Sequence, residues 1–157
     1  MQQITPFLWF NDNAEEAVNF YASIFKDAKI IEVARYGDAG PGPKGSVMTM
    51  KFRLNGLEFV ALNAGPHYSF TPAISFVVNC ENQAEVDHYW DKLLEGGKSM
   101  QCGWLTDKFG LSWQIVPTQL PKLLQDKDPA KAKRVMEAMM KMVKLDIPTL
   151  EEAAKAQ

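Results

Sequence analysis

The sequence predicts an α+β fold built from two βαβββ modules and a set of C-terminal helices. Alternation of apolar and polar residues, typical of strands, gives way to helical spacing and then returns, and this happens twice along the chain. The two halves also repeat, because Phe20-Tyr21 in the first predicted helix matches Tyr89-Trp90 in the second, 69 residues later. From Gln119 onward the composition is helical. We therefore expect a single domain, 1–157, in which two similar modules present the same helix face to the same kind of sheet.

The first module is expected to span residues 1–64. Its strands are expected at residues 4–10, 30–36, 46–54 and 57–63. Asn11-Asp12-Asn13 reads as a turn that caps a helix beginning near Ala14. The inward stripe of this helix should comprise Ala14, Ala17, Val18, Tyr21, Ile24 and Phe25. Asn55-Gly56 is a strong hairpin signal and joins the last two strands.

A linker at residues 65–72 is expected to lead into the second module, residues 73–117. The elements predicted before the final hairpin are a strand at 73–79 and a helix at 83–94. The module ends in a hairpin at 102–117. Asp107-Lys108-Phe109-Gly110 supplies its turn, in which Gly110 is free to take a positive φ.

The polar residues of this hairpin indicate where a site would lie. By the period-two rule, one arm presents Trp104, Thr106 and Lys108 on one face, and the other arm presents Ser112, Gln114 and Val116. Gln114 lies within the apolar run 113–116, so if it is buried its amide needs hydrogen-bond partners from the protein or from a ligand. We therefore expect the hairpin to close a cavity.

Residues 118–157 are predicted to form a helical extension. Asp128-Pro129 is a helix start signal, and Thr149 and Glu152 have the spacing of a capping box for the last helix. The apolar stripe of the extension comprises Met136, Met139, Met140 and Val143. We interpret this stripe as packing, either in the core or in a subunit contact.

The charge pattern argues against nucleic acid and membrane surfaces as partners. The chain has 17 Lys and Arg against 19 Asp and Glu, a net charge of −2, and the charges are dispersed. No apolar run approaches the ~20 residues of a membrane-spanning helix, and no signal-peptide pattern opens the chain, so we expect a cytoplasmic protein. Cys80 and Cys102 should then be reduced thiols.

The chain combines a paired βαβββ pattern, with Phe20-Tyr21 in its first helix, and a closing hairpin that runs from Asp107 to Gln114. In these two features it resembles the vicinal oxygen chelate superfamily, which includes glyoxalase I, fosfomycin-resistance and bleomycin-resistance proteins and extradiol dioxygenases. The resemblance covers about residues 4–117. Segments 70–76, 102–110 and 113–117 are most similar to the PhnB-like branch, often labelled demethylubiquinone methyltransferase. The resemblance implies curved mixed sheets around a ligand cavity, usually in a homodimer.

The positions that hold a metal in metal-dependent relatives carry no carboxylate or imidazole in this chain. By resemblance they fall on Thr5 or Pro6, on Ala61 or Asn63, on Ser75 and on Gln114. A divalent cation on such a set would keep its charge uncompensated, so no metal is expected. His67 and His88 are expected to be ordinary loop and surface residues. The glycine-rich turn of a common S-adenosylmethionine site is also absent from the sequence, so no cofactor is expected.

The resulting functional hypothesis is a metal-free cavity protein that binds a small, partly apolar or aromatic ligand. The residues expected to contact the ligand are Trp9, Phe59, Asn63, Ser75, Trp104, Lys108 and Gln114, with Trp113 as a further wall. The alternative is an enzyme of unassigned reaction in the same cavity, whether lyase, isomerase or methyltransferase, with Lys108 or Asp107 as a proton carrier. A turn role suits that pair better, because turns favour both residue types.

Overall fold

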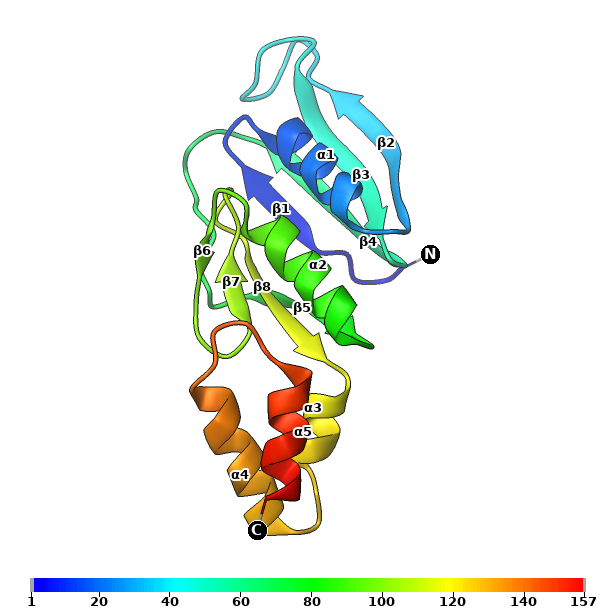
Figure 1. The fold of residues 1–157 in the computed structure, drawn as a ribbon. Helices are drawn as coiled ribbons and strands as arrows, with labels where there is room; N and C mark the ends of the chain where they lie inside the picture. The colour runs from blue at the N-terminus through cyan, green and yellow to red at the C-terminus, as the bar shows by residue number, and fades with distance from the viewer. Residues whose placement is uncertain (1, 157) are drawn as a thin grey trace. The chain divides into compact units, whose positions relative to one another are not determined.

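The computed structural model of the protein describes residues 2–156 and divides the chain into two compact units. The first ends at Phe70 and the second begins at Thr71, a boundary that falls inside the expected linker. Each unit contains one four-stranded sheet and one helix packed on it, and the second unit also carries the C-terminal helices (Figure 1). Across residues 2–156, no helix has the length and apolarity needed to cross a bilayer.

The first unit has the βαβββ order that the sequence predicts. Its elements are β1 (Phe7–Phe10), α1 (Ala14–Ile24), β2 (Ala28–Arg35), β3 (Val47–Leu54) and β4 (Leu57–Asn63). The sheet order is β1-β4-β3-β2, with β1 parallel to β4 and the other pairs antiparallel. All six residues of the expected inward stripe on α1 are buried. Asn55 and Gly56 both have positive φ, as a two-residue hairpin turn of the predicted kind requires.

The start of α1 differs from the prediction. Asn13 occupies the cap position, but its side chain makes no capping hydrogen bond. Instead, the Ala14 N–H donates to Oδ1 of Asn63, at the end of β4, over 2.9 Å. A residue 49 positions away in the sequence therefore satisfies one of the free amides of the first turn, a long-range arrangement that a local cap signal does not reveal.

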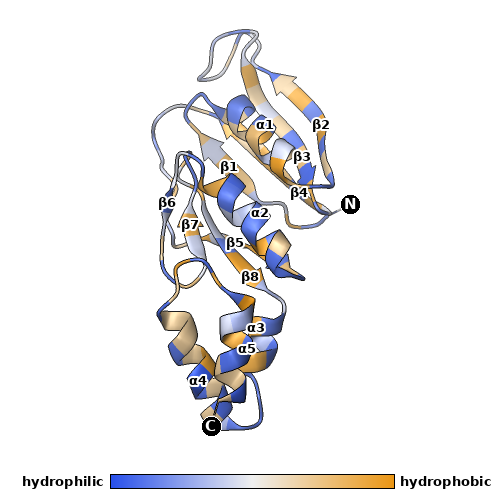
Figure 2. Cartoon of the chain, viewed as in Figure 1, coloured by the Kyte–Doolittle hydropathy of each residue, from blue (hydrophilic) through white to orange (hydrophobic). Residues whose placement is uncertain are grey.

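The second unit repeats the same order of elements. They are β5 (Ser75–Cys80), α2 (Gln83–Leu94), β6 (Lys98–Ser99), β7 (Trp104–Thr106) and β8 (Ser112–Pro117), in the sheet order β5-β8-β7-β6. The predicted bounds of α2 are confirmed, and Oδ1 of Asn82 caps it by accepting from the Glu85 N–H over 2.9 Å. Figure 2 shows hydrophilic and hydrophobic stretches along α2, as expected of a helix with one face on a sheet.

Three helices complete the second unit and lie together (Figure 1): α3 (Gln119–Leu124), α4 (Pro129–Met140) and α5 (Ile147–Lys155). Their buried core consists of Leu120, Val135, Leu145, Leu150 and Ala154, with Val116, Leu123, Leu124, Met139 and Met142 packed against it. The predicted start of α4 is confirmed, because Asp128 accepts from the Ala130 N–H over 3.0 Å.

One prediction for these helices is wrong and another is confirmed only in part. The last helix begins at Ile147, and its cap is Asp146, which accepts from the Thr149 N–H over 3.0 Å; Thr149 and Glu152 do not form the capping box. The methionine stripe is only partly buried. Met139 packs against the helical core beside Val135, whereas Met136, Met140 and Val143 are 40%, 62% and 40% exposed. For these three residues a subunit contact stays a prediction.

Candidate functional site

The face of the second sheet opposite α2 brings several of the predicted residues together. The register pairs Trp104 with Gln114, and Gln114 with Val77. The residues on either side of Gln114 in β8, Trp113 and Ile115, are buried beneath α2, so Gln114 points the other way. The pairing of Trp104 with Gln114 and of Thr106 with Ser112 confirms the predicted alternation in both arms. Lys108 is the exception, because β7 ends at Thr106.

The amide of Gln114 finds one protein partner. Its Nε2 donates to Ser75 Oγ over 2.8 Å, a bond that joins β8 to β5. Its Oε1 has no hydrogen-bond donor among residues 2–156. A half-buried amide in an apolar setting thus retains one acceptor that is available to a ligand.

A pocket of about 350 Å³ opens beside Gln114. The side chains that line it are Cys102, Trp104, Gln114, Val116, Leu120, Pro121, Leu124, Gln125 and Met139. One wall comes from the end of the sheet and the other from α3 and α4. The lining includes no Asp, Glu, Lys, Arg or His, and its polar side-chain groups are two amides, one thiol and the indole N–H of Trp104. This arrangement suits an uncharged and largely apolar molecule.

The turn of the hairpin lies outside this pocket. The Asp107 carboxylate is 3% exposed and accepts from the Phe109 N–H over 2.8 Å, the Leu111 N–H over 3.1 Å and Trp113 Nε1 over 2.9 Å. Lys108 is exposed, with its ammonium 5.5 Å from the centre of the Phe109 ring. Asp107 therefore shapes the turn, and Trp113, expected as a cavity wall, packs in the core.

Three predicted residues lie in the first unit. Trp9 is half-buried, donates from Nε1 to the Gly65 carbonyl over 2.9 Å and meets Tyr68 edge to face with the ring centres 4.9 Å apart. Phe59 is buried on the α1 side of its sheet, where it stacks on Phe52 at 5.2 Å. Trp9 and Phe59 thus differ in their surroundings, one near the surface and one in the core.

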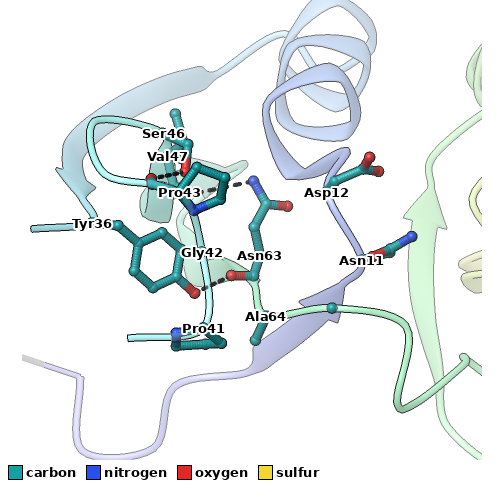
Figure 3. Close-up of a pocket in the computed structure, with 11 residues that line it drawn as sticks. Asn11, Asp12, Tyr36, Pro41, Gly42, Pro43, Ser46, Val47, Asn63 and Ala64 are labelled. Atoms are coloured by element: carbon teal, nitrogen blue, oxygen red, sulfur yellow. Dashed lines mark hydrogen bonds between the residues drawn. The ribbon is translucent and has the colours of Figure 1, made fainter. Parts of the chain in front are cut away.

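Asn63 lines a second pocket, of about 290 Å³, in the first unit (Figure 3). The other residues that line it are Asn11, Asp12, Tyr36, Pro41, Gly42, Pro43, Ser46, Val47, Ala64 and Gly65. Besides its bond to α1, Asn63 donates from Nδ2 to the Val47 carbonyl over 3.2 Å, and the Tyr36 hydroxyl donates to its carbonyl. Figure 3 shows the side chains of Asn11 and Asp12 pointing away from the Tyr36 ring. The polar groups around that ring are thus engaged within the protein.

The two cysteines are free thiols in different surroundings. Cys80 is fully buried, and burial, followed by the nearby Glu85 carboxylate, raises the pKa of its thiol to about 12. Cys102 is half-buried at the pocket and adopts a positive φ of 59°. Cys102 is therefore the more accessible of the two thiols, and Cys80, which is buried and has a raised pKa, should be unreactive.

The donor groups near Gln114 do not fit a divalent cation. Within residues 2–156, no three His, Cys, Asp or Glu side chains come together as metal ligands. Ser75 and Gln114 are neutral and bond to each other. A cation placed there would meet no carboxylate or imidazole to balance its charge.

Sequence reasoning missed the helical wall of the pocket. Leu120, Leu124 and Met139 carry only the helical periodicity of any packed helix, which does not tell which sheet face they cover. Val116 was placed on the correct face by alternation, and Cys102 lies just before the first strand of the hairpin. A pocket formed between a sheet and a separate helical segment has no local sequence signal.

Comparison with known proteins places these features in a family context. The family model described as 3-demethylubiquinone-9 3-methyltransferase matches residues 2–116. A putative 3-demethylubiquinone-9 3-methyltransferase, PhnB protein, from Bacillus cereus is 40% identical, and the match covers 74% of this chain and 100% of that one with a TM-score of 0.69. No curated protein matches the chain.

Two more distant structures share the fold. Protein PA1353 from Pseudomonas aeruginosa is 24% identical, covering 74% of this chain and 98% of that one, with a TM-score of 0.63. The fosfomycin resistance protein FosX from Listeria monocytogenes is 16% identical, covering 78% and 97%, with a TM-score of 0.53. The family model ends at Val116, so α3, α4 and α5 lie outside the matched region.

Proposed function

Because the chain belongs to the 3-demethylubiquinone-9 3-methyltransferase family, the PhnB-like branch of the vicinal oxygen chelate superfamily, we propose that it binds a small, partly apolar or aromatic molecule without a metal. The proposed site is the pocket beside Gln114. The observation that carries the proposal is its composition: a tryptophan and aliphatic walls around the unpaired Gln114 Oε1. Protein sites for small molecules have this character, with apolar surfaces and a few placed polar groups.

The chemistry of the pocket supports binding in preference to methyl transfer. A methyl donor of the S-adenosylmethionine type carries a sulfonium cation and a charged amino-acid group, and charges removed from water need partners. No charged side chain lines the pocket to provide them. Asp107, the candidate proton carrier for general acid-base catalysis, does not line the pocket, and its carboxylate is bound by three N–H donors of its own hairpin.

The lack of charged side chains in the pocket also supports a function that needs no metal. Elemental analysis after purification without added metal should find far less than one zinc, nickel, manganese or iron per chain. One such ion per chain would contradict the proposal.

Cys102 provides a direct test of ligand binding. Native mass spectrometry of freshly purified protein identifies molecules that remain bound, and a compound so identified should slow the alkylation of Cys102 by iodoacetamide. The Cys102→Ser variant is the control, because Cys80 is fully buried with a pKa of about 12 and should stay unlabelled. If neither copurified compounds nor a library of neutral aromatic molecules slowed the labelling of Cys102, the proposed function would be wrong.

We also propose that the protein forms a homodimer. The support is the set of exposed apolar side chains on and after α4: Met136, Met140 and Val143. A monomer mass in sedimentation at micromolar concentration would contradict this.

A further inference from the structure

We propose that the C-terminal helices α3 and α4 determine which ligand the pocket accepts, and that this ligand is a neutral molecule with an apolar ring or chain and one hydroxyl group. The proposal rests on the proposed function, since it concerns the same pocket. It goes further by assigning the selecting residues to the part of the chain that the family model does not match.

The extension supplies more than half of the pocket wall. Five of the nine lining residues come from it: Leu120, Pro121, Leu124, Gln125 and Met139. Of these, Leu120 belongs to the buried helical core, and Leu124 and Met139 pack against that core. These three side chains therefore pack against the helical core on the side away from the pocket, and this packing fixes the surface that a ligand would contact.

Two backbone hydrogen bonds anchor the extension to the sheet beside the pocket. The Cys102 N–H donates to the Met142 carbonyl over 2.9 Å, and the Gly103 N–H donates to the Val143 carbonyl over 2.8 Å. Gly103 has a φ of 84°, and a Cβ on it would lie 2.8 Å from Leu145 Cδ1, so the two segments approach as closely as a glycine allows.

A second anchor joins the extension to α2. Gln83 donates from Nε2 to the Leu145 carbonyl over 3.1 Å, and its Oε1 accepts from the Ile147 N–H over 2.8 Å. Lys144 Nζ lies 2.9 Å from Asp87 Oδ1. With both anchors in place, the helical wall belongs to the same compact unit as the strands and sets the shape of the pocket.

The charge of the lining excludes ionised ligands. The nine residues carry no formal charge, so a carboxylate or ammonium group would give up its water without gaining an ionic partner. Trp104, Val116 and the helical wall instead favour an aromatic or aliphatic group, and a pocket of about 350 Å³ limits its size.

Gln114 defines the polar part of the ligand. Its Nε2 is held by Ser75, which leaves Oε1 to accept a hydrogen bond. A hydroxyl group can donate to this oxygen without bringing a charge into the pocket. A phenol combines such a donor with an apolar ring and is therefore the simplest probe.

Three probes with the same apolar group test the class of ligand by titration calorimetry at pH 7: 4-propylphenol, propylbenzene and 4-propylbenzoate. We expect the phenol to bind about two- to tenfold more tightly than propylbenzene, because one net hydrogen bond is gained. The benzoate should bind at least about tenfold more weakly than the phenol, because its charge stays unpaired. Equal or tighter binding of the benzoate would overturn the neutral class.

Variants of the helices test which segment selects the ligand. Leu124→Trp fills the pocket and should weaken binding of 4-propylphenol at least about tenfold. Lys122→Trp is the matched control, since Lys122 is an exposed residue of the same helix α3 that does not line the pocket, and it should leave binding within about twofold. Because a large residue can disturb folding, Leu124→Ala is the second variant. It enlarges the pocket and should favour 4-hexylphenol over 4-propylphenol relative to the native chain.

The outcomes separate the two proposals. If 4-propylphenol slows the alkylation of Cys102 but neither change at Leu124 alters affinity or the preference for chain length, the helical wall does not select the ligand, and only this inference is overturned. The same holds if none of the three probes binds while a copurified compound still protects Cys102. If no compound of any charge protects Cys102, both proposals are wrong.

Discussion

Gln114 reaches diagonally across the second sheet to Ser75, the register partner of Ser112, and donates to its hydroxyl over 2.8 Å. The two residues are 39 positions apart in the sequence and lie on neighbouring parallel strands. Gln114 lies opposite Val77, and Ser75 is two residues before Val77 on the same face, so the long Gln114 side chain can reach the Ser75 hydroxyl. The bond therefore ties the closing hairpin to the strand that begins the second module.

Ser75→Ala should lower the free energy of unfolding by about 0.5–1.5 kcal/mol, because it leaves Nε2 of the half-buried Gln114 without its acceptor. Urea unfolding measures the loss. Asn79→Ala is the control, since Asn79 is an exposed residue of the same strand. Equal losses of stability in the two variants would mean that the hydrogen bond contributes nothing, and that both losses reflect the change in strand propensity.

Asp107→Asn should destabilise the fold by about 1–3 kcal/mol, because one of the two accepting oxygens becomes an NH2 group that can only donate, and at least one of the three N–H groups loses its acceptor. Lys108→Ala, in the same turn but exposed, should cost at most about 1 kcal/mol, the size of an exposed cation–π contact. Thermal unfolding followed by tryptophan fluorescence compares them. Comparable losses would show that the carboxylate does not organise the hairpin.

The ion pair between Asp87 and Lys144 gives stability a defined pH dependence. The Lys144 ammonium, and then the Gln83 amide, hold the pKa of Asp87 below its usual value, and Asp87 raises the pKa of Lys144. The Asp87 contribution is thus present above the unfolded pKa of about 3.9 and is lost as pH falls through the lower folded value. The Lys144 contribution is present below about pH 10.4 and is lost as pH rises through the higher folded value.

Asp87→Asn should therefore reduce stability between pH 5 and pH 9 by a constant amount and lessen the loss in acid. The two side chains are 45% and 37% exposed, so the amount should be about 0.2–1 kcal/mol. Urea unfolding at pH 3, 5, 7 and 9 with the native chain as reference measures it. A difference that changed between pH 5 and pH 9 would contradict the assignment to this pair.

Asp146→Ala should cost about 1 kcal/mol, the usual loss when a helix cap is removed, whereas Glu152→Ala should change stability by less than about 0.5 kcal/mol. The contrast follows from the Thr149 N–H, whose acceptor is the Asp146 carboxylate. Denaturant unfolding of the two variants provides the measurement. A larger loss of stability for Glu152→Ala than for Asp146→Ala would contradict the cap at Asp146 and support the capping box of Thr149 and Glu152.

Local signals predicted the parts of this fold that local physics controls. The Asn55-Gly56 turn, the bounds of α2 and the face shared by Trp104 and Gln114 all follow from backbone preferences and side-chain periods within a few residues. The 69-residue repeat then relates the two modules, because each buries the same face of its helix on its own sheet.

The sequence-based predictions fail where contacts between residues far apart in the sequence determine the structure. The α1 amide could find its acceptor in Asn63 only after β4 was in place, and the buried side of α4 was chosen by the helices around it, so Val135 is inside and Met140 outside. The second wall of the pocket is the same kind of feature, since Leu124 and Met139 reach it through the docking of helices onto a sheet. The family model, which ends at Val116, carries no information about that wall.

The anchoring of Cys102 and Gly103 to Met142 and Val143 also has a consequence for biosynthesis. A ribosome makes the two strands of the closing hairpin well before the carbonyls that accept from these amides. Until these residues have been made, the two amides can donate only to water. The side chains of Trp104 and Val116 are not yet faced by those of α3 and α4. A nascent chain can therefore complete its second sheet before it has a pocket, because the pocket forms only once α3 and α4 have been made and have docked onto that sheet.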